Sequence, residues 1–263
     1  MLYKYRFLLW ALLFTLANYG QGETSNWYFG NGAGITFNND GTVTPLTNGR
    51  LDTFEGCASI SDAAGNLILY TDGIRVFDRY HNIMQNGNNL YGDPSSTQSA
   101  IIVEKPDDPN ILYIFTVDTK TFEEDPDRGF NYSVVDLSLN GGNGAITQKN
   151  INLLADCSEK ISAVVKDCFD KSIWVVTLGF DSDQSRSFDA YYAYEVSNLG
   201  VNPTPVKSTF ADLEILDPRG YLKFSPDGSI LAAAHAFSGL HLYDFDINTG
   251  IVSNPQIIEI SDE

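Results

Sequence analysis

The chain has 263 residues, with 34 Asp and Glu against 16 Lys and Arg, which gives a formal net charge of −18. Hydrophobic residues make up 43% and aromatic residues 13% of the sequence, a composition that excludes intrinsic disorder and favours strands. The acidic surplus argues against nucleic acid and anionic lipid as partners, because both bind through basic surfaces.

The N-terminus has the pattern of a secretory signal peptide. Lys4 and Arg6 precede an apolar run over residues 7–16, and small residues follow. This run is too short to span a hydrocarbon layer of about 30 Å at about 1.5 Å per residue. We therefore predict a signal peptide over residues 1–22, with a membrane anchor or a buried N-terminal helix as the alternatives. The rest of the chain is expected to be secreted or on the cell surface, with no membrane insertion.

The three cysteines are Cys57, Cys157 and Cys168. Export permits disulfides, and Cys157 and Cys168 are close enough in sequence to meet across neighbouring loops. A Cys157–Cys168 disulfide is therefore one prediction, and the alternative is that all three are small buried apolar residues. No C-x-x-C pair is present, which argues against a zinc site.

The rest of the sequence is typical of an all-β protein. Short apolar runs alternate with turn signals of Gly, Asn, Asp and Pro, and no convincing amphipathic helix is present. The last unit is the clearest, with strands predicted over 221–225, 229–234, 239–244 and 251–260. Four antiparallel strands in about 40 residues is the pattern of one β-propeller blade.

Three earlier stretches follow the same template more loosely. The blades are predicted over about 57–84, 98–153, 161–210 and 220–260, after a partial N-terminal blade of two or three outer strands over 26–46. The fold class is thus predicted as an all-β β-propeller with WD40-like four-stranded blades. About four blades and a partial one are marginal for a closed ring, so an incomplete or open ring is expected.

An Asp closes the third strand of three predicted blades, at Asp78, Asp136 and Asp244. An Asp in this place can accept hydrogen bonds from the backbone N–H groups of the following turn. We therefore assign these three residues a structural role.

Six segments are long and distinctive enough to suggest a family. They are N-W-Y-F-G-N-G-A-G-I-T-F-N (26–38), C-A-S-I-S-D-A-A-G-N-L-I-L-Y-T-D-G (57–73), H-N-I-M-Q-N-G (81–87), S-S-T-Q-S-A-I-I-V (95–103), I-W-V-V-T (173–177) and Y-L-K-F-S-P-D-G (221–228). They resemble the N-terminal propeller region of large secreted proteins of gliding bacteria. Such proteins carry a gliding-motility-associated C-terminal domain, which is the sorting signal for type IX secretion.

The sequence departs from this family in two places. The C-terminal sorting domain is missing, and Leu178 stands where such proteins often carry a His. The first departure suggests a truncated chain, and the second weakens the case for a polar site at that strand end. The resemblance implies an exported or cell-surface protein and no defined catalytic activity.

No catalytic, cofactor-binding or metal-binding residue is assigned. The glycine-rich segment 30–34 precedes a predicted strand, whereas a dinucleotide loop must open a helix. His81, His235 and His241 have no nucleophile in a recognisable context. The stretch 244–250 lacks the Gly and Glu positions of an EF-hand loop.

The sequence therefore predicts a non-enzymatic binding or scaffold module, the N-terminal part of a larger gliding-motility-associated or adhesin-like protein. The expected partner is an unknown protein, peptide or glycan, bound where loops converge on one face of the ring. The long acidic loops 119–130 and 179–189 are the best candidates, and calcium in acidic loops is a further option. The alternatives are a propeller-based hydrolase or lactonase with a carboxylate-bound metal, and a structural spacer within an adhesin.

Overall fold

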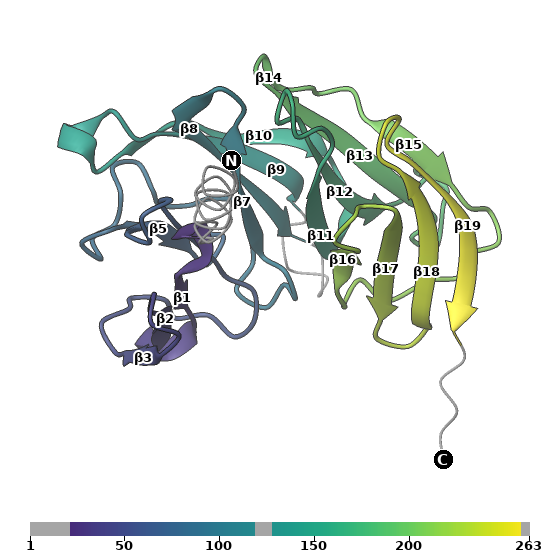
Figure 1. The fold of residues 1–263 in the computed structure, drawn as a ribbon. Coiled ribbons are helices and arrows are strands. Elements are labelled where there is room, and N and C mark those ends of the chain that lie inside the picture. Colours follow the sequence, from purple (N-terminus) through teal and green to yellow (C-terminus); the bar gives the residue numbers. More distant parts are fainter. Residues whose placement is uncertain (1–21, 119–127, 259–263) are drawn as a thin grey trace, which may run out of the picture.

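The computed structural model describes residues 22–118 and 128–258 (Figure 1). The predicted signal peptide lies outside these ranges except for its last residue. The helices within them are three short 3₁₀ turns: η1 (Gly22–Thr24), η2 (Gly30–Gly32) and η3 (Asn140–Gly142). None of the helices in these two ranges is long and apolar enough to cross a bilayer.

The described residues form five antiparallel sheets, as expected for an all-β protein. The first contains β1 (Asn26–Tyr28), β2 (Gly34–Phe37) and β3 (Val43–Leu46), and the second contains β4 (Ala58–Ser61), β5 (Leu67–Thr71) and β6 (Val76–Asp78). The third contains β7 (Ala100–Lys105), β8 (Asp108–Asp118), β9 (Gly129–Asp136) and β10 (Ala145–Leu154). The fourth contains β11 (Cys157–Val165), β12 (Ile173–Gly179), β13 (Ala190–Ser197), β14 (Gly200–Val201) and β15 (Val206–Thr209). The fifth contains β16 (Leu222–Phe224), β17 (Ile230–His235), β18 (Gly239–Asp246) and β19 (Ile251–Ile258).

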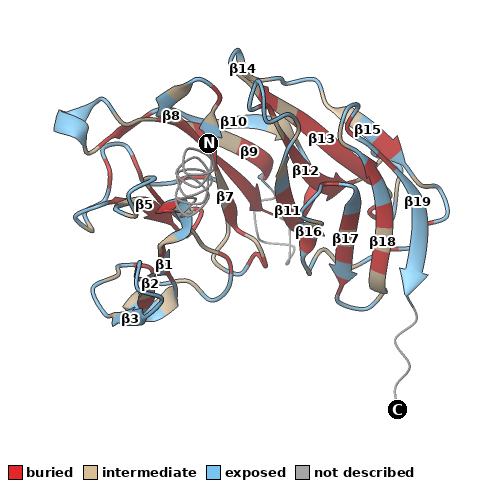
Figure 2. Cartoon of the chain, in the orientation of Figure 1, coloured by how far each residue is buried: buried red, intermediate tan, exposed pale blue. Residues whose placement is uncertain are grey.

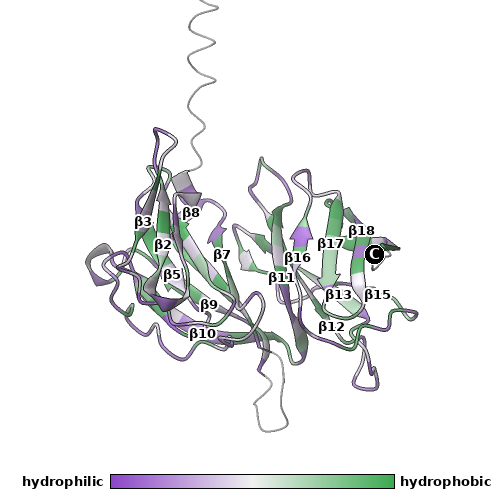
Figure 3. Cartoon of the chain, turned by 90° about the horizontal axis from the view of Figure 1, so that it is seen from below, coloured by the Kyte–Doolittle hydropathy of each residue, from purple (hydrophilic) through white to green (hydrophobic). Residues whose placement is uncertain are grey.

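The sheets follow one another in chain order across Figure 1, from β1–β3 at the lower left to β16–β19 at the right. In the view from below, β7, β11 and β16 lie toward the middle, with β3 and β18 at the two sides (Figure 3). The first strands of neighbouring sheets pack on one another, β4 on β7, β7 on β11 and β11 on β16. These four are called the inner strands below, and the arrangement is β-propeller-like.

The first sheet differs from its prediction. Residues 26–46 were expected to be outer strands without an inner partner, but β1 lies beside β4 and joins the row of inner strands. Ser59 of β4 donates a hydrogen bond from its hydroxyl to the Asn26 carbonyl, at 2.7 Å. The Asn26 amide donates in turn to the Ser61 hydroxyl, at 3.0 Å. The side chain of Asn26 thus satisfies polar groups that the contact between the two sheets buries.

The hydrophobic core lies between neighbouring sheets. Figure 2 shows buried stretches along β12, β13, β17 and β18, whereas β19 at the end of the row is mostly exposed. The contact between the fourth and fifth sheets contains Trp174, Tyr191 and Tyr243, and the rings of the two tyrosines meet at 4.9 Å. Aromatic side chains supply much of the buried area, which explains the aromatic content of the sequence.

The turn role assigned to Asp78 and Asp136 is confirmed. The Asp78 carboxylate accepts hydrogen bonds from the backbone of Tyr80 and Asn82, both at 2.9 Å, and Asp136 accepts one from Ser138, at 2.9 Å. The assignment of Asp244 is wrong.

The strand β18 continues past Asp244 to Asp246. It is Asp246 that accepts the backbone N–H of Asn248, at 2.9 Å. Asp244 lies two residues before the end of the strand and accepts a hydrogen bond from the Asn254 side chain, at 3.0 Å. The role therefore belongs to the residue that directly precedes the turn.

The predicted Cys157–Cys168 disulfide is also wrong. Cys157 is buried at the start of β11, where it is the register partner of Gly179. Cys168 is exposed in the turn that follows the other end of the same strand. A strand of this length separates its ends by about 25 Å, whereas a disulfide needs Cα atoms within about 7 Å.

Candidate functional site

The loops that lead into the inner strands lie at one end of the row of sheets. An inner strand starts at this end, and the hairpins that join the second strand of a sheet to the third return to it. We call the residues 53–56, 94–99, 156–160, 217–221 and 235–238 the inner rim. Loops at one end of a β scaffold are where binding groups usually gather.

Backbone hydrogen bonds join the loops of the inner rim between the second and third sheets. The N–H groups of Phe54 and Glu55 both point at the Pro94 carbonyl, at 3.1 Å, and Gly56 donates to the Ser96 carbonyl, at 3.1 Å. A Cβ atom on Gly56 would lie 2.1 Å from the backbone nitrogen of Ser99. Only glycine permits this close approach of the two loops.

The third, fourth and fifth sheets meet at the inner rim around Thr97. The Glu159 carboxylate accepts hydrogen bonds from the backbone N–H and the hydroxyl of Thr97, both at 2.8 Å. The backbone N–H of Gly220 points at the same hydroxyl, at 3.3 Å. Burial raises the pKa of Glu159, and the two hydrogen bonds from Thr97 oppose that shift.

Lys160 is a fully buried lysine whose charge is satisfied by backbone carbonyls. Its ammonium group donates to the carbonyls of Pro218 and Arg219, at 2.7 and 2.8 Å. Burial lowers the pKa of Lys160 to about 8, against the opposing effect of the Glu159 and Asp217 carboxylates. The side chain is therefore mostly protonated at neutral pH, and it fixes the segment that leads into β16.

Two histidines are buried at the same end of the fifth sheet. The His241 ring has its Nε2 atom 2.9 Å from the Ser238 carbonyl and its Nδ1 atom 3.1 Å from the Tyr243 hydroxyl. Because a carbonyl only accepts, Nε2 carries the proton and Nδ1 accepts from Tyr243. The ring centroid of His235 lies 4.7 Å from that of His241.

His235 differs from His241 because neither of its ring nitrogens has a hydrogen-bond partner among the described residues. Its side chain is only 6% exposed. Burial lowers the pKa of His235 to about 3, and the positive charge of Lys160 adds to the shift. His235 is therefore neutral at physiological pH, with one donor and one acceptor unused.

The solvent-exposed side of the inner rim carries an ion pair and exposed aromatic side chains. The Arg219 guanidinium donates to both carboxylate oxygens of Asp217, at 2.9 and 2.7 Å. The same guanidinium lies over the ring of Phe237, 5.3 Å from its centroid. Phe237 is 81% exposed, and Phe54 in the loop that leads into β4 is 89% exposed.

The predicted acidic loop 179–189 lies beside the inner rim. Its Phe188 donates a backbone hydrogen bond to the Ile215 carbonyl, at 2.8 Å. One of its acidic groups is already neutralised, because Lys207 lies 2.7 Å from the Asp181 carboxylate and over the Tyr192 ring. A cavity of about 300 Å³ opens here between Asp156 and this loop. The other predicted loop, 119–130, falls largely outside the described residues.

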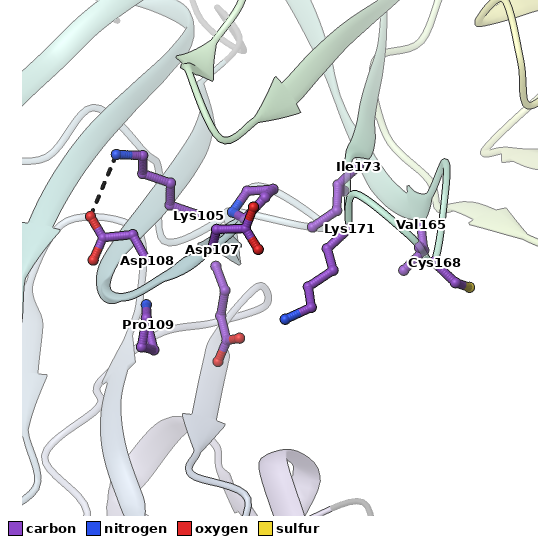
Figure 4. A pocket seen from close by; sticks show the side chains of 10 residues that line it. Lys105, Asp107, Asp108, Pro109, Val165, Cys168, Lys171 and Ile173 are labelled. Carbon is purple, nitrogen blue, oxygen red and sulfur yellow. Dashed lines mark hydrogen bonds and ion pairs between the residues drawn. The ribbon is translucent and has the colours of Figure 1, made fainter.

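A second cavity, of about 580 Å³, opens at the far end of the sheets. Figure 4 shows it between the turn that joins β7 to β8 and the turn that joins β11 to β12. Lys105 and Asp108 form an ion pair on one side, at 3.4 Å, and Lys171 and Cys168 lie on the other. Both charge signs are present, so the lining favours no single class of ligand.

Side chains of the kinds that bind metal ions do not cluster in the described parts of the chain. Within residues 22–118 and 128–258, no group of three His, Cys, Asp or Glu side chains is arranged to hold a metal ion. His81 is far from the other two histidines in the sequence and pairs with Asn48, at 2.8 Å, and with the Tyr70 hydroxyl, at 3.1 Å.

The sequence carries a pattern that marks the loops of the inner rim. The spacing Asp-x-x-Glu occurs at Asp52–Glu55 and at Asp156–Glu159, shortly before or at the start of two inner strands, and Asp-Pro occurs at 93–94 and 217–218 before the other two. Acidic and Pro residues at matching places in repeated units indicate equivalent loops. No such repeated pattern identifies Thr97, Lys160 or Arg219 in the sequence.

Comparison with known proteins supports the fold class. No protein-family model matches the sequence, and no curated protein matches it. Among solved structures, the chain is similar to a putative 6-phosphogluconolactonase from Bacteroides fragilis, with a TM-score of 0.51 and 13% identity over 89% of this chain and 67% of that one. A likeness at this identity shows the fold alone.

Two further structures are similar at lower scores. A functionally unknown protein from Desulfotomaculum acetoxidans has a TM-score of 0.49 and 11% identity, over 89% of this chain and 66% of that one. Sqt1 from Saccharomyces cerevisiae has a TM-score of 0.46 and 12% identity, over 89% of this chain and 58% of that one. The chain thus spans between 58% and 67% of the length of the three structures.

Proposed function

We propose that this chain is a secreted or cell-surface, propeller-like module that binds or scaffolds other molecules and performs no catalysis. The observation that carries the proposal is the inner rim, where loops from four sheets are joined by hydrogen bonds and present exposed Phe54 and Phe237 beside Arg219. A rigid surface of aromatic and Arg side chains is typical of protein-binding sites. The resemblance to the propeller region of gliding-motility-associated proteins supports export and a place within a larger protein.

The exposed apolar faces of the first and fifth sheets support the proposal that this chain is part of a larger ring of four-stranded blades. On the first sheet, Trp27, Ile35, Phe37 and Val43 share the face that points away from the second sheet, and the rings of Trp27 and Phe37 meet at 5.1 Å. The outer face of this sheet is thus apolar, as expected for a sheet face that a further layer covers. We propose that further sheets cover this face in the working protein.

The fifth sheet has the same property at the other end of the row. Ile230, Ala232, Leu240 and Leu242 share its outer face with one acidic residue, Asp244. Leu231 and Tyr243 on the inner face are fully buried against the fourth sheet. The proposed covering is again a β-sheet with a matching apolar face. In the similar structure from Bacteroides fragilis, about a third of the chain has no counterpart here. That length is sufficient for further sheets.

Ligand screening tests the proposed function. The purified chain is applied to glycan arrays and to peptide libraries, and its metal content and hydrolysis of lactones are measured on the same preparation. Binding of a defined ligand without turnover supports the proposal. A tightly held divalent ion together with lactone hydrolysis would contradict it and favour the alternative enzyme. Export is tested separately, by protease treatment of intact cells that produce the chain.

A further inference from the structure

The exposed apolar side chains of the inner rim form one surface. Phe237 packs against the Arg219 guanidinium. The hydrogen bonds and charge of Asp217 raise the pKa of Arg219, and the charge of Glu55, which follows Phe54, adds to this shift. Leu216, which precedes Asp217 in the sequence, is 72% exposed. Scattered exposed apolar residues are ordinary, but an exposed aromatic ring stacked on an Arg side chain is typical of an interaction site.

This surface is already ordered before anything binds. Arg219 is fixed by its two hydrogen bonds to Asp217, and its carbonyl accepts hydrogen bonds from Lys160 and from the backbone of Ala236, at 2.8 and 3.3 Å. A surface held in this way loses little conformational entropy when a partner docks.

The charge of the surrounding loops selects the partner. The loops 47–57, 92–99, 155–160 and 210–221 contain eight Asp and Glu and three Lys and Arg, so their net charge is 3 − 8 = −5. One of the three bases, Lys160, is buried and bonded to backbone carbonyls. An acidic surface around apolar side chains attracts a basic segment and repels an acidic one.

His235 adds an observation that is independent of charge. It lies two residues before Phe237, is more than nine-tenths buried, and has two ring nitrogens with no hydrogen-bond partner in the described ranges. Buried polar atoms are nearly always satisfied by protein, water or ligand. The His235 ring lies beside His241 and near Lys160 at this end of the fifth sheet, and its unused hydrogen-bonding capacity supports a polar ligand there.

We propose that the inner rim is a docking surface for a segment of a partner protein that carries Lys or Arg next to an aromatic or branched apolar side chain. The apolar side chain packs on Phe237 beside Arg219, and the basic side chain pairs with the exposed carboxylate of Glu55. This inference rests on the proposed binding function and names the class of partner for the same site.

The test uses the full chain and libraries of short peptides in matched pairs, with equal apolar content and either Lys and Arg or Asp and Glu as the charged residues. Binding is measured by fluorescence anisotropy at low and at physiological ionic strength. We expect binding of cationic peptides only, weakened by salt because exposed charges are screened beyond about 8 Å at physiological ionic strength. The variants Phe237→Ala and Glu55→Gln are each expected to reduce affinity by about tenfold.

Matched control variants lie at the end of the sheets opposite the inner rim. Phe169 is 99% exposed in the turn between β11 and β12, and Asp107 is exposed in the turn between β7 and β8. Phe169→Ala and Asp107→Asn should leave affinity unchanged, and circular dichroism checks the folding of each variant. Silence from all cationic peptides, a preference for anionic ones, or an equal loss in the control variants overturns the inference.

A glycan bound at the inner rim in place of a peptide also overturns the inference, although the proposed function then stands. A chain that binds neither peptides nor glycans contradicts both. The two failures are therefore distinguishable in one set of measurements.

Discussion

Thr97 and Glu159 are 62 residues apart in the chain, and two hydrogen bonds of 2.8 Å join them at the inner rim. The contact links the loop before β7 to the start of β11, so it ties the third sheet to the fourth. Both residues are buried, at 8% and 2% exposure. A carboxylate that accepts two hydrogen bonds in a buried place contributes more to stability than an exposed pair does.

Replacement of Glu159 should weaken the contact between these sheets. In Glu159→Ala, the backbone N–H of Thr97 loses its acceptor in a buried place, and the expected cost is about 2 kcal/mol of unfolding free energy. Glu159→Gln keeps an acceptor oxygen and should cost less. Urea unfolding monitored by tryptophan fluorescence measures both variants.

A double-mutant cycle with Thr97→Val isolates the hydrogen bond between the Thr97 hydroxyl and the Glu159 carboxylate. The combined variant should lose less stability than the sum of the two single variants, because both remove the same hydrogen bond. Strict additivity would show that Thr97 and Glu159 act independently, contrary to the structure.

The buried His235 predicts a loss of stability in acid. Its pKa is lowered from 6.5 to about 3 by burial and by Lys160, so between these values the unfolded chain binds a proton that the folded chain does not. Stability contributed by neutral His235 is therefore full above about pH 6.5 and falls as the pH drops toward 3, by roughly 3–5 kcal/mol in all. Denaturant unfolding over this pH range measures it.

The variant His235→Leu separates this effect from the titration of carboxylates. The two charged or titratable groups that act on His235 are Lys160 and His241, and neither is altered in the variant. The stability of the variant should fall less steeply between pH 6.5 and 3 than that of the natural chain. Parallel curves for the two proteins would show that His235 does not titrate as the structure indicates.

The aspartates that end or nearly end the third strands give a paired comparison. Asp78→Ala removes a buried acceptor of two backbone N–H groups and should destabilise the chain by about 1–3 kcal/mol. Asp244→Ala removes one exposed contact with Asn254 and should change stability by less than about 0.5 kcal/mol. Thermal unfolding of both variants measures the difference, and equal losses would contradict the distinct roles that the structure gives them.

The strands were predictable because their patterns are local. The fifth sheet forms over the stretches expected from the apolar runs and from turns such as Pro226-Asp227-Gly228, where the Asp227 carboxylate accepts the backbone N–H of Ser229, at 3.1 Å. The place of β1 was not predictable, because it depends on hydrogen bonds between Asn26 and residues of β4 that are over 30 positions away.

The inner rim was harder to predict than the strands for the same reason. Lys160 in the sequence looks like an ordinary exposed lysine between Glu159 and Ile161. Its burial depends on the carbonyls of Pro218 and Arg219, which the fold brings close. The predicted disulfide failed because distance along the sequence says little about distance in space when a whole strand lies between two residues.

The close approach at Gly56 gives the sharpest structural prediction. A Cβ atom there would meet backbone atoms of Ser99 and Ser96, at 2.1 and 2.7 Å, and backbone cannot move aside as a side-chain tip can. Gly56→Ala should therefore separate the loop before β4 from the loop before β7 and destabilise the chain by more than about 2 kcal/mol. Gly41→Ala is the control, because its Cβ would meet nothing within 4 Å and only its positive φ of 83° adds a cost, of about 1 kcal/mol. Equal effects of the two substitutions in urea unfolding would contradict the tight contact on which the inner rim depends.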